Sequence, residues 1–152
     1  MKKILFLIIT ILVTNTSFAD LIKPNPNINS QDVIKIQLNA LKQNNEPYEN
    51  AGIEQTWAFA HPFNRAYTGP IEKFTYMLYS PGYVVMIDHQ NHNIIFISED
   101  LNTGYYFIEL TDKIGDKYGF QWTVKKVLEE GDYKDCWMTI GVSQPIPLAK
   151  ST

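Results

Sequence analysis

The sequence predicts an α+β domain in which three helices precede a curved antiparallel sheet of four to five strands. Apolar residues recur at helical spacing as far as Leu78, and from Tyr83 onward the period changes to the two-residue alternation of strands. Short groups of glycine, proline and asparagine separate these segments. Helices followed by a run of strands are typical of a domain whose helices pack on one face of the sheet.

A first helix is expected over residues 31–43. Ile34, Leu38 and Leu41 recur at i, i+4 and i+7, which places them on one face of that helix. Ser30 stands immediately before this pattern and is a favourable N-cap residue.

Two further helices are expected over residues 52–60 and 70–78. Pro62 is expected to stop the first of them, because the residue before a proline disfavours the helical region. Pro70 suits the first position of the next helix, where its missing N–H is not needed. The joint between them, Trp57–Phe74, mixes aromatic residues with one histidine and one arginine and has no simple period. We interpret its aromatic residues as packing between the helices and the sheet.

The alternating pattern after the helices predicts strands joined by turns. Residues 91–93 and 102–104 are expected to form turns, and Pro145 and Pro147 are expected to end the ordered chain. The expected strands cover residues 83–87, 94–97, 105–110, 120–124 and 136–143. One face of the last strand is expected to carry three apolar residues, Met138, Ile140 and Val142.

The N-terminus has the pattern of a secretory signal peptide. Two lysines follow Met1, an apolar run covers residues 4–13, and Ser17-Phe18-Ala19 forms a small-x-small exit. A membrane-spanning helix needs roughly 20 apolar residues, so this run is too short to be one. We predict cleavage after Ala19 and a periplasmic or secreted product without membrane attachment. The expected division is a signal peptide over 1–19, an extended leader over 20–29, one α+β domain over 30–145 and a C-terminal tail over 146–152.

Charge and cysteine content limit the classes of partner. The chain has 13 basic and 16 acidic residues, and removal of Lys2 and Lys3 leaves a net charge of 11 − 16 = −5. Phosphate binding needs clustered lysine and arginine, so no nucleic-acid partner is expected. Cys136 is the only cysteine, which excludes an intramolecular disulfide. The sequence contains no G-x-S-x-G, H-E-x-x-H or phosphate-binding glycine loop, so neither a cofactor nor a metal is expected.

Four segments resemble known proteins. They read D-V-I-K-I-Q-L-N-A-L, W-A-F-A-H-P-F-N, T-G-P-I-E-K-F and C-W-M-T-I-G-V, at Asp32–Leu41, Trp57–Asn64, Thr68–Phe74 and Cys136–Val142. The first three resemble the uncharacterised domain-of-unknown-function family 4864, found in secreted bacterial and in plant proteins. The order of elements is similar to the cone-shaped fold of the nuclear transport factor 2-like superfamily, which includes ketosteroid isomerase, scytalone dehydratase and polyketide cyclases. The resemblance implies a pocket between helices and sheet, and it carries no established reaction.

Three interpretations of function follow. The first is a non-enzymatic binding or interaction module with a pocket for a small apolar or amphipathic ligand. The second is an enzyme of the isomerase, dehydratase or cyclase kind that uses His61 or Asp88 as general base. The third is an interaction domain that forms a homodimer through its sheet face. We favour the first, because aromatic residues are many and no paired acid and base is evident.

The candidate ligand contacts are Trp57, His61, Asn64, Arg65 and Tyr83. If they form one site, an enclosed pocket should touch His61 and at least two aromatic residues of the joint. The alternative is structural: His61 and Asn64 would then satisfy the last carbonyls of the second helix. Asp88 would likewise be the solvated end of a strand.

Overall fold

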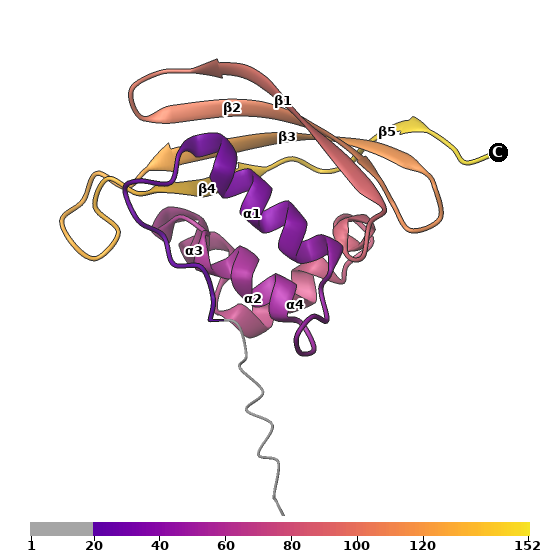
Figure 1. The fold of residues 1–152 in the computed structure, drawn as a ribbon, viewed down its shortest axis with the longest axis horizontal. Helices are drawn as coiled ribbons and strands as arrows, with labels where there is room; N and C mark the ends of the chain where they lie inside the picture. Colours follow the sequence, from indigo (N-terminus) through magenta and orange to yellow (C-terminus); the bar gives the residue numbers. More distant parts are fainter. Residues whose placement is uncertain (1–19) are drawn as a thin grey trace, which may run out of the picture.

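An open antiparallel sheet covered on one face by helices makes up the computed structural model of this protein (Figure 1). The structure describes residues 20–152, so the expected signal peptide lies outside the described residues. The predicted α+β class is confirmed, and five strands agree with the four to five expected. The described residues form four α-helices rather than three.

The helices come first, and most of their bounds agree with the prediction. α1 spans Ser30–Lys42, α2 spans Ala51–Ala58 and α4 spans Ile71–Leu78, close to the three predicted helices. The additional helix, α3, covers Pro62–Thr68, and a short 3₁₀ helix, η1, covers Val84–Met86.

The strands are β1 (Asn91–Glu99), β2 (Thr103–Thr111), β3 (Lys117–Lys126), β4 (Trp137–Val142) and β5 (Ile146–Ala149). Their order is β1-β2-β3-β4, and β5 also pairs with β3. β3 is long enough for two partners, because Trp122–Lys126 pairs with β4 and Lys117–Gly119 pairs with β5. The boundary expected at residue 145 therefore does not coincide with the end of the sheet.

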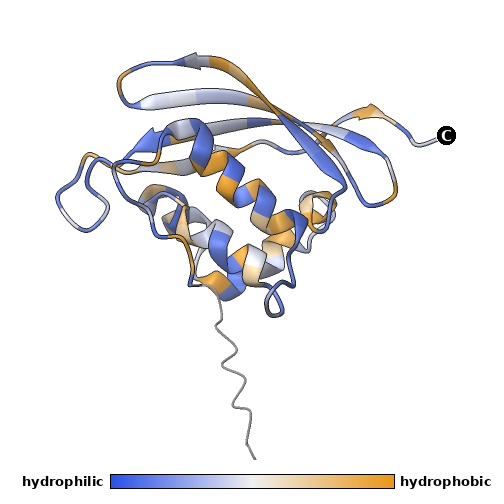
Figure 2. Cartoon of the chain, viewed as in Figure 1, coloured by the Kyte–Doolittle hydropathy of each residue, from blue (hydrophilic) through white to orange (hydrophobic). Residues whose placement is uncertain are grey.

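The core lies between α1 and the inner face of the sheet. Alternate residues of β2 and β3 are buried, and they meet the apolar stripe of α1. Figure 2 shows hydrophobic and hydrophilic residues interleaved along α1, as expected of a helix with one buried face. The core residues of these three elements are Val33, Ile34, Leu38, Leu41, Tyr106, Ile108, Leu110, Phe120, Trp122 and Val124.

The start of α1 differs from the prediction by one residue. Asn29, not Ser30, is the N-cap, and its Oδ1 accepts the backbone N–H of Asp32 over 2.8 Å. Ser30 is instead the first helical residue. Its hydroxyl lies 2.6 Å from the hydroxyl of Tyr106 and also bonds the carboxylate of Glu99, so it ties the helix to the sheet.

The proline expected to stop the second helix starts another. Pro62 occupies the first position of α3, where a proline is favoured, and His61 is its N-cap. Between α2 and α3 the backbone makes a bridge to β4: Thr139 N–H donates to the Phe59 carbonyl and His61 N–H to the Thr139 carbonyl, both over 2.8 Å. The joint is therefore a helix held against the sheet.

The first predicted strand, over residues 83–87, is wrong. This segment is the 3₁₀ helix η1, with Met86 N–H donating to the Tyr83 carbonyl. It pairs with no strand of residues 20–152 and is instead hydrogen-bonded to the ends of two helices: Val84 N–H donates to the Ser80 carbonyl just after α4, and Asp88 N–H to the Leu41 carbonyl of α1. Residues 91–93, expected to form a turn, begin β1 instead.

The N-terminal leader is held against α2. The leader has no regular element but is anchored, because Ile22 N–H donates to Gln55 Oε1 and Gln55 Nε2 donates back to the Ile22 carbonyl. None of the helices in residues 20–152 is long and apolar enough to cross a membrane.

Candidate functional site

A cavity of about 150 Å³ lies between the helices and strands β3 and β4. All four α-helices, η1 and the two strands contribute to its wall. The cavity is mostly apolar, with a small number of amide and hydroxyl groups, which is the usual composition of a small-molecule site. Its lining residues are Gln37, Leu41, Thr56, Ala60, Asn64, Thr68, Phe74, Met77, Leu78, Tyr83, Met86, Trp122, Thr139, Gly141 and Val142.

Four buried polar residues form a chain of hydrogen bonds at the inner end of the cavity. Trp122 Nε1 donates to Thr139 Oγ1 over 3.0 Å, and Thr139 Oγ1 donates to Gln37 Oε1 over 2.5 Å. Gln37 Nε2 then donates to the Thr56 carbonyl over 3.0 Å. Gln37 is 1% exposed and Thr139 is 3% exposed, so these bonds are shielded from water.

The outer end of the cavity carries partly exposed polar groups. Tyr83 donates its hydroxyl proton to the Val142 carbonyl over 3.3 Å and accepts Gln144 Nε2 over 3.2 Å. Asn64 Nδ2 reaches the Thr139 carbonyl at 3.4 Å, a long hydrogen bond. Tyr83 is the only ionisable group among the described residues that line the cavity, and burial raises the pKa of its phenol. The cavity wall is therefore uncharged at neutral pH.

The structure brings two of the five predicted ligand contacts to this cavity. Asn64 and Tyr83 line it, whereas Trp57, His61 and Arg65 do not. A cavity is present, but it is not the pocket expected from the joint, because His61 is outside it. Its aromatic residues are Phe74, Tyr83 and Trp122, of which only Phe74 belongs to the joint.

His61 has a structural position. The residue is 5% exposed, and Nδ1 accepts the backbone N–H of Phe63 over 3.1 Å at the start of α3. The neutral ring therefore carries its proton on Nε2. Nε2 has no partner of good hydrogen-bond geometry among the described residues, although the backbone of Lys126 is close enough to favour the protonated ring. Burial is the larger effect and lowers the pKa of His61.

Arg65 and Trp57 stabilise the joint. Arg65 Nη2 donates to the carbonyls of Trp57 and Ala58, at 3.0 and 3.1 Å, and so satisfies the end of α2. The guanidinium also stacks on the rings of Trp57 and Tyr133, 4.9 and 5.5 Å from their centroids. Trp57 packs against Phe74, with their ring centroids 5.2 Å apart, and Phe74 in turn lines the cavity. Arg65 thus satisfies the last carbonyls of α2, the role that the structural alternative gave to His61 and Asn64.

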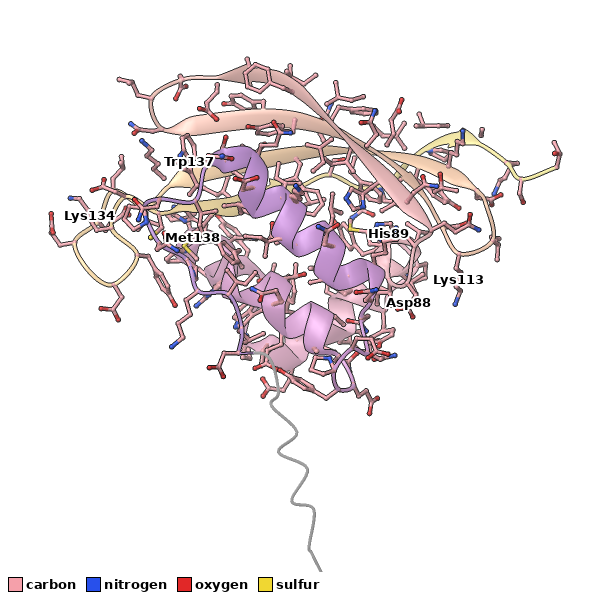
Figure 3. All side chains as sticks on the ribbon, viewed as in Figure 1. Asp88, His89, Lys113, Lys134, Trp137 and Met138 are labelled. Carbon is pink, nitrogen blue, oxygen red and sulfur yellow. The ribbon has the colours of Figure 1, made fainter. Side chains whose placement is uncertain are left out.

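Asp88 also lies away from the cavity. Its carboxylate accepts the backbone N–H of Asn44 over 3.2 Å, just beyond the end of α1. It adopts a left-handed backbone conformation with φ 55°, which reverses the chain before β1. Figure 3 places Asp88 and His89 together at the end of the molecule opposite Lys134. Neither candidate base, His61 or Asp88, reaches the cavity.

A pair of imidazoles follows Asp88. His89 is 2% exposed, with Nδ1 2.7 Å from the Met86 carbonyl and Nε2 2.7 Å from Nδ1 of His92. Burial lowers the pKa of both rings, and that of His92 falls to about 4, with the facing His89 and Lys42 as further causes. No cluster of three or more possible metal ligands occurs in residues 20–152, so the pair lacks a third ligand for a metal centre.

The inner polar residues were missed from the sequence, although one signal was present. Gln37 lies at i+3 from Ile34 and therefore on the apolar stripe of α1, where a polar residue is unusual. Thr139 was not predicted to be buried, because regular alternation of the last strand places Met138, Ile140 and Val142 on one face and Thr139 on the other. Ile140 is an extra residue between the pairs Gly141↔Thr123 and Thr139↔Val124, so Met138 and Val142 do not share one regular face with it.

Comparison with protein-family models, with curated proteins and with solved structures gave no match.

Proposed function

We propose that this protein is a non-enzymatic binding module that holds one small, uncharged and mainly apolar molecule in the cavity between its helices and sheet. The observation that carries the proposal is the cavity itself: about 150 Å³, lined mainly by apolar side chains, with a small set of polar groups at its two ends. Sites of this composition are the usual binding sites for small molecules.

The volume limits the size of the ligand. Apolar cavities of about 150 Å³ stay dry and accept a molecule of the size of benzene. The cavity of this protein has that volume, so a single ring with a short substituent is the expected class of ligand. A steroid or a polyketide needs several times this volume.

The uncharged wall limits the chemistry. An ion moved into a buried site costs several kcal/mol unless a partner charge compensates for it, and no lining residue among those described supplies one. Acid–base catalysis in the cavity would need a carboxylate or an imidazole within hydrogen-bond reach of the ligand. His61 and Asp88 are engaged elsewhere, which favours binding over the isomerase-like alternative.

Methionine NMR tests the proposal directly. Met77 and Met86 line the cavity, whereas Met138 packs in a separate cluster with Val127 and Cys136. In the protein labelled with ¹³C at the methionine methyl groups, toluene is expected to shift the signals of Met77 and Met86 in a saturable manner. Met138 (labelled in Figure 3) serves as the internal control and should not shift. The proposal fails if all three signals respond alike or if none responds.

A cavity-filling variant makes the test specific. Val142 lines the cavity and pairs across the sheet with Trp122, so Val142→Phe adds a ring inside it. We expect Val142→Phe to abolish the toluene response. The matched control is Thr123→Phe on the adjacent outward-facing position of β3, which should leave the response unchanged.

An interaction surface is a second candidate function, favoured by the outer face of the sheet. Ile97 and Tyr105 are 59% and 46% exposed there, and they share a shallow depression with Phe107. We propose homodimer formation through this face as the alternative, since exposed apolar patches often mark interfaces. Native mass spectrometry of the wild type and of Tyr105→Glu tests it: a dimer that dissociates in the variant is expected, and a monomeric wild type contradicts it.

The finer family and cellular assignments belong to the same proposal. We infer a cone-like arrangement of the nuclear transport factor 2-like kind, with relationship to domain-of-unknown-function family 4864, from the order of elements and the quoted motifs. Export to the periplasm rests on the signal-peptide pattern of residues 1–19. Detection of a mature N-terminus at Asp20 by mass spectrometry would support it, and an intact Met1 would contradict it.

A further inference from the structure

We infer that the ligand presents a neutral hydrogen-bond acceptor, such as a ketone, ester or amide oxygen, to the side-chain amide of Gln37 at the inner end of the cavity. This inference deepens the proposed function and rests on it. It follows from the direction of the hydrogen bonds from Trp122 through Thr139 and Gln37 to Thr56, and from the second N–H of Gln37 Nε2, which these bonds do not use.

The direction of the chain is fixed by its two ends. The indole N–H of Trp122 is a donor only, so Thr139 Oγ1 accepts from it and uses its own proton elsewhere. The carbonyl of Thr56 is an acceptor only, so the group of Gln37 that faces it is the amide nitrogen. The amide oxygen of Gln37 must then face Thr139, as observed.

This orientation leaves Gln37 with an unused proton. A side-chain amide nitrogen carries two N–H groups, and Gln37 Nε2 has one acceptor, the Thr56 carbonyl. Among the described residues this nitrogen makes no second hydrogen bond. Gln37 is 1% exposed, so bulk water does not supply one freely. A buried donor without an acceptor is costly, and a ligand oxygen would remove that cost.

The other inner groups do not compete for this role. Thr139 has given its proton to Gln37, and Trp122 has given its proton to Thr139. Thr56 Oγ1 donates to the Gly52 carbonyl over 2.8 Å. Gln37 is thus the residue of the inner end with a donor to spare, and a neutral acceptor is favoured over an anion because no positive charge lies in the wall.

The experiment compares acetophenone with α-methylstyrene. The two molecules have the same shape and the same number of non-hydrogen atoms, and they differ in carrying an oxygen or a CH₂ group. Dissociation constants come from the Met77 and Met86 methyl shifts. The binding free energy of each compound is then compared with its measured free energy of transfer from water to cyclohexane. Cyclohexane represents an apolar cavity without a hydrogen-bond donor.

We expect acetophenone to bind about tenfold more tightly, relative to α-methylstyrene, than cyclohexane transfer predicts. Benzoate should produce no saturable shift. In Gln37→Met, which keeps the side-chain length and removes both N–H groups, the tenfold excess should disappear while α-methylstyrene still binds. Asn64→Ala, whatever its effect on affinity, should keep the excess, since Asn64 has no hydrogen bond to Gln37 among the described residues and its amide donates to the Thr139 carbonyl.

The outcomes separate the two proposals. If acetophenone shows no excess over cyclohexane transfer, or if Asn64→Ala rather than Gln37→Met removes it, the inference is overturned and the binding function stands. If neither compound shifts the Met77 and Met86 signals, the proposed function fails together with the inference. The wild-type comparison decides the first question even if Gln37→Met does not fold.

Discussion

Thr139 of β4 donates its hydroxyl proton to Gln37 of α1 over 2.5 Å, across a separation of 102 residues in the chain. This bond joins the helical layer to the sheet at a point where both side chains are buried. The same threonine accepts the indole N–H of Trp122, so one hydroxyl connects three elements. A single residue thus contributes both to the stability of the fold and to the inner wall of the cavity.

Thr139→Val should destabilise the protein strongly. Valine has the same shape but leaves Trp122 Nε1 and Gln37 Oε1 buried without a partner, and each such loss costs about 1–3 kcal/mol. Urea unfolding should give a free energy of unfolding lower by about 2–6 kcal/mol. Thr123→Val on β3 is the matched control, because Thr123 pairs with Tyr105 in the sheet and its side chain makes no hydrogen bond within residues 20–152, so its effect should stay within about 0.5 kcal/mol. Equal effects of the two substitutions would contradict the role given to Thr139.

The fold could be predicted from the sequence where one periodic pattern decided the structure. The apolar stripe of α1 and the alternating residues of β2 and β3 are both observed as predicted. The segment over residues 83–87 failed for a tertiary reason. Its five residues are all apolar and would suit a buried strand, but the backbone is hydrogen-bonded to the ends of α1 and α4 and pairs with no strand among the described residues.

The candidate site was less accessible to sequence reasoning. His61 and Arg65 were predicted to contact a ligand, because their side chains can bind one. In the structure they instead form hydrogen bonds with the backbone at the start of α3 and at the end of α2. The residues at the inner end of the cavity are an amide and a hydroxyl. Their importance depends on the pairing of β4 with β3, and a bulge at Ile140 shifts that pairing in a way that no local pattern predicts.

Gly52→Ala should also reduce stability, by a steric mechanism. A Cβ atom at Gly52 would overlap the backbone carbonyl of Ala40, where α2 crosses the end of α1, and a backbone group cannot move aside as a side chain can. We expect a loss of about 2 kcal/mol or more in the free energy of unfolding. Gly141→Ala is the control: nothing lies within 4 Å of the added carbon there, so its effect should be small. A tolerated Gly52→Ala would mean that the two helices are not in close contact.

The three histidines should show different tautomers in their neutral forms. His61 Nδ1 accepts a backbone N–H, so its proton is on Nε2. His89 faces the Met86 carbonyl through Nδ1, so Nδ1 carries its proton, Nε2 accepts, and His92 must donate from Nδ1. Long-range ¹H–¹⁵N correlation spectra at neutral pH should therefore give Nε2–H for His61 and Nδ1–H for His89 and His92. An Nε2–H tautomer at His89 would contradict the observed pair.

Stability should fall on acidification because all three histidines have lowered pKa values. Burial is the largest cause in each case, and Lys42 adds to it at His89 and His92. In the unfolded chain these rings take up protons near pH 6.5, whereas His92 in the folded protein does so only near pH 4. Within that window the unfolded state binds more protons, so the free energy of unfolding is highest above pH 6.5 and decreases as the pH falls toward 4.

His92→Gln isolates the contribution of the imidazole pair. The glutamine amide can still donate to His89 Nε2, but it does not titrate. Urea unfolding at several pH values should give a pH dependence smaller than that of the wild type by about one proton. The substitution should have its greatest relative benefit near the acid end of the window, because there the wild-type unfolded state gains most from protonation of His92. A variant with the same pH dependence as the wild type would show that His92 titrates equally in the folded and unfolded chains, and hence that the pair is open to water.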